Sequence, residues 1–129
     1  MSVVGVCHFF SHFYQLALPP LFVLIHQAEG YSYANLALLV TVLYTTSFAL
    51  QLPVGFFVDR VGARSVLIGG LALEAVAIGM FGVATAYWQL LVLAAIAGVG
   101  HTVFHPADYA ILSARVSEQR MGRAFSIHS

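Results

Sequence analysis

Formal charge is scarce in this chain, and that scarcity limits the kinds of protein it can be. Only 8% of the 129 residues are charged and 60% are hydrophobic, whereas roughly 25% of residues are charged in an ordinary soluble domain. Too few polar side chains remain to cover so much apolar surface in water, which excludes a free-standing water-soluble fold. The composition therefore predicts an all-α integral membrane protein with the lipid bilayer as its surroundings.

Lysine is absent, cysteine occurs once, and the formal net charge is zero. The single cysteine, Cys7, cannot form an internal disulfide. Because no net positive charge or basic face is present, we expect no nucleic-acid partner. No glycine-rich phosphate-binding loop is present either, so we do not expect the chain itself to couple its function to ATP hydrolysis. Neither an enzyme activity nor a cofactor is expected.

Long apolar runs occupy most of the chain. At about 20 residues per membrane-spanning helix, they predict four spans, over residues 3–25, 33–57, 65–87 and 88–113, followed by a charged loop over 114–123 and the start of a fifth helix over 124–129. The first run is too long for a signal peptide, and no basic residue precedes it. A helix over 88–113 would be about 39 Å long, against a hydrocarbon core of about 30 Å. We expect tilt or a kink at Pro106 to absorb the excess.

The basic residues are distributed on one side of the predicted topology. With four spans, the loop between the second and third spans lies on the same side as the segment after the fourth span. All five basic residues fall on that side, namely Arg60, Arg64, Arg115, Arg120 and Arg123. Positively charged loops remain in the cytoplasm, so we expect both ends of the chain to be cytoplasmic in a multi-pass protein of the plasma or inner membrane.

Two segments carry a family resemblance. Residues 55–64, GFFVDRVGAR, resemble the signature loop between helices two and three of the major facilitator superfamily, which has glycine, apolar residues, Asp-Arg, an apolar residue, glycine and basic residues. Residues 98–106, GVGHTVFHP, and 120–126, RMGRAFS, are similar to helix four and the following loop of that superfamily. The Phe-His-Pro at 104–106, with His12 and the prolines at 19–20, is similar to the fosmidomycin-resistance-type branch of exporters.

The resemblance implies an architecture and a set of partners. Members of the superfamily have twelve helices in two related six-helix halves. This chain would then be the first four helices and the start of the fifth, an incomplete part whose partners include the missing remainder of the transporter. The resemblance also implies a small-molecule substrate and protons as further partners, and a central cavity lined by the first and fourth helices.

The polar segment after the second predicted span is a candidate cytoplasmic gating loop. It contains two glycines and three charged residues, namely Gly55, Gly62, Asp59, Arg60 and Arg64. Glycines permit close helix approach and tight turns. Asp59 can accept hydrogen bonds from a helix N-terminus or pair with arginine, and the arginines can bind carboxylates. Such a group can form a breakable connection at the cytoplasmic mouth; the simpler alternative is a solvated anchor that only fixes topology.

Polar side chains form one stripe on each of two predicted spans. The stripe on the first span contains His8, His12 and Gln15, and the stripe on the fourth contains His101, His105 and Asp108. The i, i+4, i+7 spacing confines each set to an arc of about 60° on a helix. Polar stripes turn away from lipid, toward partners or a water-filled cavity. Since both helices line the cavity in the superfamily, the two stripes would face the same space.

Three interpretations of these histidines stay open. They can form a substrate and proton site, since imidazole gains and loses a proton near neutral pH and Asp108 would favour a charged His105. They can be structural, with hydrogen bonds between helices. They can also bind a metal, although no cysteine or carboxylate cluster supports a closed cage and we assign no metal ligands. We interpret Glu74, the one charge within the third run, as a packed or interfacial carboxylic acid rather than part of a proton relay.

The leading hypothesis is a secondary active transporter of the major facilitator type that exports a small molecule against proton entry. Two alternatives from other classes remain. One is a membrane metal-binding protein that uses the intramembrane histidines. The other is a small membrane protein that acts only through helix–helix interaction.

The predicted topology can be tested by cysteine labelling. After Cys7 is replaced, a single cysteine at Ala63 should react with a membrane-impermeant thiol reagent only from the cytoplasmic side. A single cysteine at Glu29 should react only from the outside, because no arginine lies on that side. The opposite labelling pattern would show that the orientation is wrong.

Overall fold

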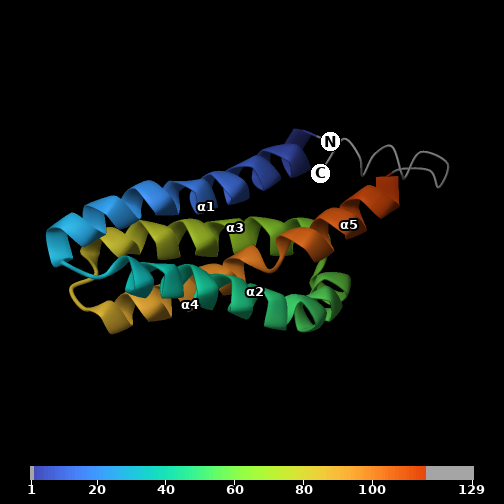
Figure 1. Ribbon diagram of the computed structural model, residues 1–129. Coiled ribbons are helices and arrows are strands. Elements are labelled where there is room, and N and C mark those ends of the chain that lie inside the picture. The colour runs from blue at the N-terminus through green and yellow to red at the C-terminus, as the bar shows by residue number, and fades with distance from the viewer. Residues whose placement is uncertain (1, 116–129) are drawn as a thin grey trace.

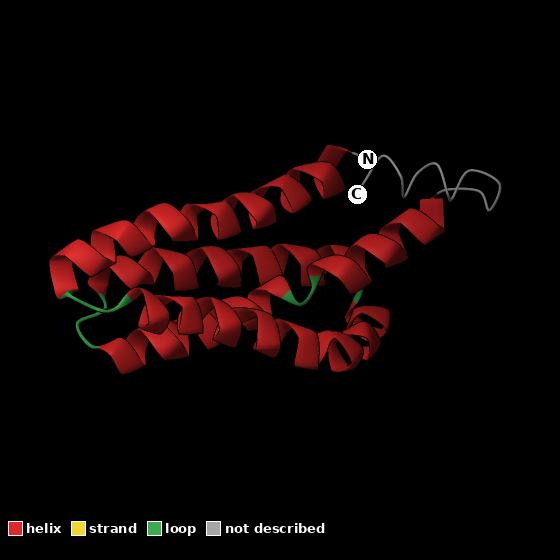
Figure 2. Ribbon diagram, viewed as in Figure 1, coloured by secondary structure: helices red, strands yellow, loops and turns green. Residues whose placement is uncertain are grey.

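The apolar runs form helices, the secondary structure that pairs its own backbone groups where no water is present. The computed structural model describes residues 2–115; the side chains of residues 2–5, 7, 8, 11, 108, 109, 112, 113 and 115 lie outside this description. Every regular element in the described part is helical (Figure 2). The elements are α1 (Ser2–Glu29), α2 (Tyr33–Val61), α3 (Ala63–Gly79), the 3₁₀-helix η1 (Met80–Val83), α4 (Tyr87–His101) and α5 (Phe104–Arg115).

Within residues 2–115, three segments are long and apolar enough to cross a membrane. They are Tyr33–Val61, Ala63–Val83 and Tyr87–Ala107. The all-helical class and the membrane-spanning character expected from the composition are therefore confirmed. The predicted number of four spans plus a fifth is not, because α1 is not among the three and residues 116–129, with the predicted loop and fifth helix, lie outside the described residues.

The first two helices are longer than their apolar runs. Helix α1 continues through Pro19 and Pro20 to Glu29, and Gly30 ends it with a φ of 73° and an amide that donates to the His26 carbonyl. This left-handed conformation is common just after a helix and suits glycine. The predicted loop over 26–33 therefore shrinks to residues 30–32.

The polar segment after the second run is not the loop predicted from the sequence. Helix α2 continues past Pro53 to Val61, and Gly62 alone separates it from α3. Gly62 has a φ of 99°, a conformation that L side chains rarely adopt. The turn predicted at Gly62 is therefore present, but Asp59 and Arg60 belong to the last helical turn before it.

The fourth run is interrupted before Pro106 rather than at it. Helix α4 ends at His101, and α5 begins at Phe104, so that Pro106 lies in the first turn of α5. Proline has no amide hydrogen to pair with the Thr102 carbonyl four residues earlier, and its ring would crowd that carbonyl. The break between α4 and α5 over residues 102–103 therefore includes the carbonyl that Pro106 leaves without its usual helical donor. The Thr102 hydroxyl donates to the Ser47 carbonyl of α2.

Helix α4 is the centre of the packing. It packs against both α2 and α3, whereas α1 packs mainly on α3 (Figure 1). Two glycines of α4 allow these close approaches. A methyl group at Gly98 would collide with the Leu43 carbonyl of α2, and one at Gly100 would lie 2.7 Å from the Gly70 carbonyl oxygen of α3.

The two ends of the bundle carry different features. The start of α1, the α2–α3 corner at Gly62 and the end of α5 lie at the right in Figure 1, and the turns over 30–32 and 84–86 lie at the left. The right-hand end includes Arg60, Arg64 and Arg115, and the left-hand end includes Glu29. The predicted cytoplasmic location of the arginine-bearing end stays a prediction.

The glycine contacts of α4 predict a difference between two Gly-to-Ala substitutions. Gly100→Ala should lower the free energy of unfolding by about 1–3 kcal/mol, because its methyl group would lie 2.7 Å from backbone atoms of both Glu74 and Gly70. Gly69→Ala is the matched control, since nothing lies within 4 Å of its added carbon. It should be neutral or stabilise the helix by up to about 1 kcal/mol. Thermal unfolding of both variants in the same detergent measures the difference; equal midpoints would contradict the close contact.

Candidate functional site

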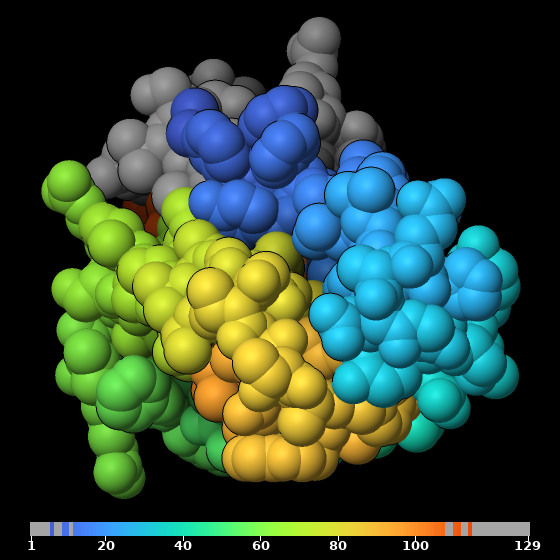
Figure 3. All heavy atoms as spheres, turned by 90° about the vertical axis from the view of Figure 1, so that its left-hand side faces the viewer, coloured from blue at the N-terminus to red at the C-terminus, as the bar shows by residue number. Residues whose placement is uncertain are grey.

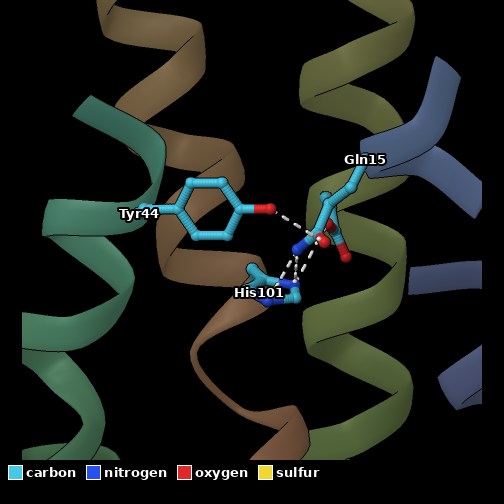
Figure 4. Close-up of polar contacts among 4 residues, drawn as sticks. Gln15, Tyr44 and His101 are labelled. Carbon is cyan, nitrogen blue, oxygen red and sulfur yellow. Dashed lines mark hydrogen bonds and ion pairs between the residues drawn. The ribbon is translucent and has the colours of Figure 1, made fainter. Parts of the chain in front are cut away.

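One polar side chain from each of four helices meets at one place in the bundle, where two of the four are buried, one is half-buried and one, Tyr44, is exposed. The four are Gln15 of α1, Tyr44 of α2, Glu74 of α3 and His101 of α4, which we call the four-helix polar cluster. Figure 4 shows Tyr44 and Gln15 reaching toward the His101 ring from opposite sides. Elsewhere these helices present apolar side chains to one another, including Leu36, Leu39, Ala94 and Ala97.

His101 is the centre of this cluster. It is the last residue of α4 and is buried, with 7% of its surface exposed. The Gln15 amide nitrogen lies 2.7 Å from Nε2 and 3.0 Å from Nδ1 of the imidazole. The Tyr44 hydroxyl donates to Gln15 Oε1 at 3.1 Å, and the Tyr44 ring meets the imidazole edge-on with centroids 6.2 Å apart. The polar residues of α1 and α4 are thus joined to each other and to α2.

Glu74 completes the cluster from α3 and is fully buried. Its Oε1 lies 3.4 Å from His101 Nδ1, and neither carboxylate oxygen has a hydrogen-bond partner among the described residues. The glycine contact explains the burial, because Gly100 packs directly against the Glu74 backbone. Sequence reasoning treated Glu74 as a packed or interfacial acid outside the site. Its isolation in an apolar helix was the available signal, since ionisable residues within spans are rare and commonly functional.

The remaining stripe residues lie around the cluster. His105, in the first turn of α5, is exposed, and its ring centroid lies 6.5 Å from that of His101. His12 is exposed on α1, one helical turn before Gln15. His8 and Asp108 belong to α1 and α5, and their side chains lie outside the described residues. The predicted pair of His105 and Asp108 therefore stays a prediction.

The residues of the predicted gating loop lie at the α2–α3 corner. Asp59 and Arg60 are exposed in the last turn of α2, and Arg64 is exposed in the first turn of α3. Asp59 is thus at a helix C-terminus, where the macrodipole disfavours a negative charge, and not at a helix N-terminus as one interpretation required. No ion pair among the described side chains involves these three residues. Nothing lies within 4 Å of a methyl group placed at Gly55, so Gly55 does not mediate a close helix contact here.

Two other features of the described residues bear on binding. Residues 2–115 contain no group of three or more His, Cys, Asp or Glu side chains, among those described, that could hold a metal ion. A groove of about 270 Å³ opens at the opposite end of the bundle, between the last turns of α1 and η1. Figure 3 looks onto this end. The groove is mainly apolar, with Glu29 and Tyr31 as its polar lining residues, and it does not include the four-helix polar cluster.

Apolar helices of membrane length indicate a multi-pass membrane protein. The chain belongs to the Major Facilitator Superfamily, whose family model matches residues 4–129. The expected superfamily resemblance is therefore confirmed, and the family supports transport as the class of function.

Curated relatives agree with this assignment. The chain is 34% identical over 73 residues to the multidrug resistance protein MdtH of Cronobacter sakazakii, and 30% identical over 73 residues to the proteins of that name from Shigella boydii and Escherichia coli. Each match covers 57% of this chain and 18% of the relative's length. No solved structure matches the chain. The narrower resemblance to fosmidomycin-resistance-type exporters stays a prediction.

Replacing Gln15 should separate α1 from the rest of the cluster. Gln15→Leu removes the amide that bonds His101 and Tyr44, and we expect a loss of about 1–2 kcal/mol in stability, as for other interhelical polar contacts in membranes. The ring nitrogens of His101 should also shift in nitrogen-15 NMR spectra. Gln27→Leu, at an exposed position of the same helix, is the matched control and should change neither measurement. Identical His101 spectra in wild type and Gln15→Leu would contradict the contact.

Proposed function

We propose that the protein is a secondary active transporter that exports a small molecule in exchange for protons. The observation that carries the proposal is the four-helix polar cluster, which links α1, α2, α3 and α4 and includes the buried side chains of Glu74 and His101. Polar and ionisable side chains are expensive within a membrane, and they occur there mainly along substrate and ion pathways. The superfamily assignment supports transport, and the relatives' name, multidrug resistance protein, supports export of small molecules.

The residues proposed for the transport cavity are the two polar stripes together with the side chains that contact them. Gln15 and His101 meet directly and supply hydrogen-bonding groups of both kinds. His12 and His105 are exposed next to them on α1 and α5. Imidazole changes its charge near neutral pH, which suits a site that alternates between proton and substrate. His8 and Asp108 extend the same stripes by position.

We assign the conformational role to the α2–α3 corner. Because the single residue Gly62 joins the two helices, a movement of α2 also moves α3. The exposed side chains of Asp59, Arg60 and Arg64 around this corner are available to segments that approach it. In the proposed topology they lie at the cytoplasmic mouth, and both ends of the chain are cytoplasmic in the plasma or inner membrane.

The two alternatives have weaker support. A membrane metal-binding protein needs several convergent ligands, and the described side chains offer no group of three. A protein that acts only through helix–helix contact does not require a buried carboxyl group that lacks a hydrogen-bond donor among the described residues, because such a group is costly in an apolar bundle.

Proton release from acidified vesicles tests the proposal. Everted membrane vesicles would contain the protein expressed from its own gene, with any sequence that the gene encodes beyond residue 129, and acridine orange would report their internal acidity. Ethidium or fosmidomycin, added outside, should release protons from these vesicles because export in the cell corresponds to uptake here. Vesicles without the protein are the control. If neither compound releases protons beyond the control, the proposal of proton-driven export is wrong.

A further inference from the structure

The carboxyl group of Glu74 is placed as a proton-binding group rather than as part of a stable ion pair. It is fully buried, and neither of its oxygens accepts a hydrogen bond from a described residue. A buried carboxylate without donors is unstable in a low-dielectric environment and is relieved by taking up a proton. The nearest group is His101 Nδ1 at 3.4 Å, which is close enough to interact electrostatically and too far for a strong hydrogen bond.

The hydrogen bonds of the cluster run from Tyr44 to His101. Tyr44 donates its hydroxyl hydrogen to Gln15 Oε1, and the Gln15 amide donates to His101, whose closer ring nitrogen is Nε2. With Nε2 as the acceptor, the imidazole hydrogen is on Nδ1, the nitrogen nearest Glu74 Oε1. The series of hydrogen bonds stops at His101, and the Glu74 carboxyl group lies beside its end at 3.4 Å.

The ionisable groups around Glu74 are few. From α4 it faces His101; α1 and α2 bring the uncharged Gln15 and Tyr44 to the same cluster. From α5, His105 contacts the ring of His101. Arg64, the nearest described arginine along α3, lies ten residues away, or about 15 Å along the helix axis. His101 lies within 3.4 Å of Glu74 and is placed to share a proton with it.

We propose that Glu74 and His101 form the proton-binding pair of this protein, with Gln15 as the residue that responds to its occupancy. The proposal rests on the proposed function and assigns the proton in it to two particular residues. One proton from the aqueous side binds the carboxylate of Glu74 and is shared with the imidazole of His101. It leaves as a proton to the other side, so the step needs no oxidant or reductant.

Binding of a proton to the Glu74–His101 pair changes the contacts of α1. When His101 carries both ring hydrogens, Nε2 can no longer accept from the Gln15 amide nitrogen. The amide must then rotate to present its oxygen to the imidazole, which turns its NH₂ group toward the Tyr44 hydroxyl. The hydrogen bond between α1 and α2 is therefore reversed when a proton is on the imidazole, with Tyr44 as the acceptor, and Tyr44 is the donor again when the pair is empty. Proton occupancy at the α3–α4 contact is in this way transmitted to α1 and α2.

Glu74→Gln tests the assignment in the vesicle assay of the proposed function. The variant keeps the size of the side chain and removes its titration, so it should lose the substrate-induced proton release while exchange of labelled for unlabelled ethidium continues. Glu74→Asp retains a carboxyl group and should recover part of the release. Glu29→Gln, which removes an exposed carboxylate at the other end of the bundle, is the matched control and should behave as wild type.

A second readout does not depend on transport. Infrared difference spectra of the protein in lipid films should show a carboxylic acid carbonyl band that appears as pH falls and is absent in Glu74→Gln. His101→Gln should move the pH at which the band appears. A merely structural Glu74 would lower the yield of folded protein in Glu74→Gln and leave proton release per molecule unchanged.

The outcomes separate the two proposals. Proton release by wild type that persists in Glu74→Gln, or is lost only in His105→Gln, overturns the pair while the proposed function stands. A titrating band assigned to Glu74 in a protein that releases no protons with either compound supports the pair and contradicts the proposed function. Absence of any band that depends on Glu74 overturns the pair.

Discussion

The close approach of α4 to its two neighbours is the contact on which the rest of the structure depends. Gly98 meets the backbone of α2 and Gly100 meets the backbone of α3, two positions apart on opposite sides of the same helix. Helices in a membrane gain little from hydrophobic burial against one another, so small residues that bring backbones together are the main source of packing. The resulting three-helix unit has α1 on its α3 side.

This contact also decides the chemistry of the interior. Because Gly100 packs against the Glu74 backbone, the carboxyl group is held where no described donor reaches it. His101 is the next residue of α4, and it follows that the imidazole arrives beside the same carboxyl group. The break between α4 and α5 comes immediately afterwards, so His101 is held by the end of one helix rather than by its middle. The close packing of the helices and the position of the polar cluster therefore both depend on the contact at Gly100.

The sequence alone was sufficient to predict features that depend on the local pattern of residues. Spacing placed Gln15 and His101 on the polar faces of their helices, and proline chemistry placed a break close to Pro106. The sequence was insufficient to predict features that depend on contacts between distant segments of the chain. The role of Glu74 requires knowing that Gly70 and Gly100 meet, which no periodicity within either helix records. The corner was also misjudged, because the charged residues Asp59 and Arg60 indicated a loop and α2 nevertheless continues to Val61.

The one-residue corner at Gly62 has a consequence for how the chain enters the membrane. With no loop between them, α2 and α3 cannot be inserted as two independent helices, since neither can cross the bilayer without fixing the position of the other. The exposed arginines on either side of the turn, Arg60 and Arg64, oppose its passage through the hydrocarbon. Entry as a helical hairpin, with the charged turn kept out of the hydrocarbon, is therefore favoured, and in that order of insertion the Glu74 carboxyl group would meet lipid before α4 is present to cover it.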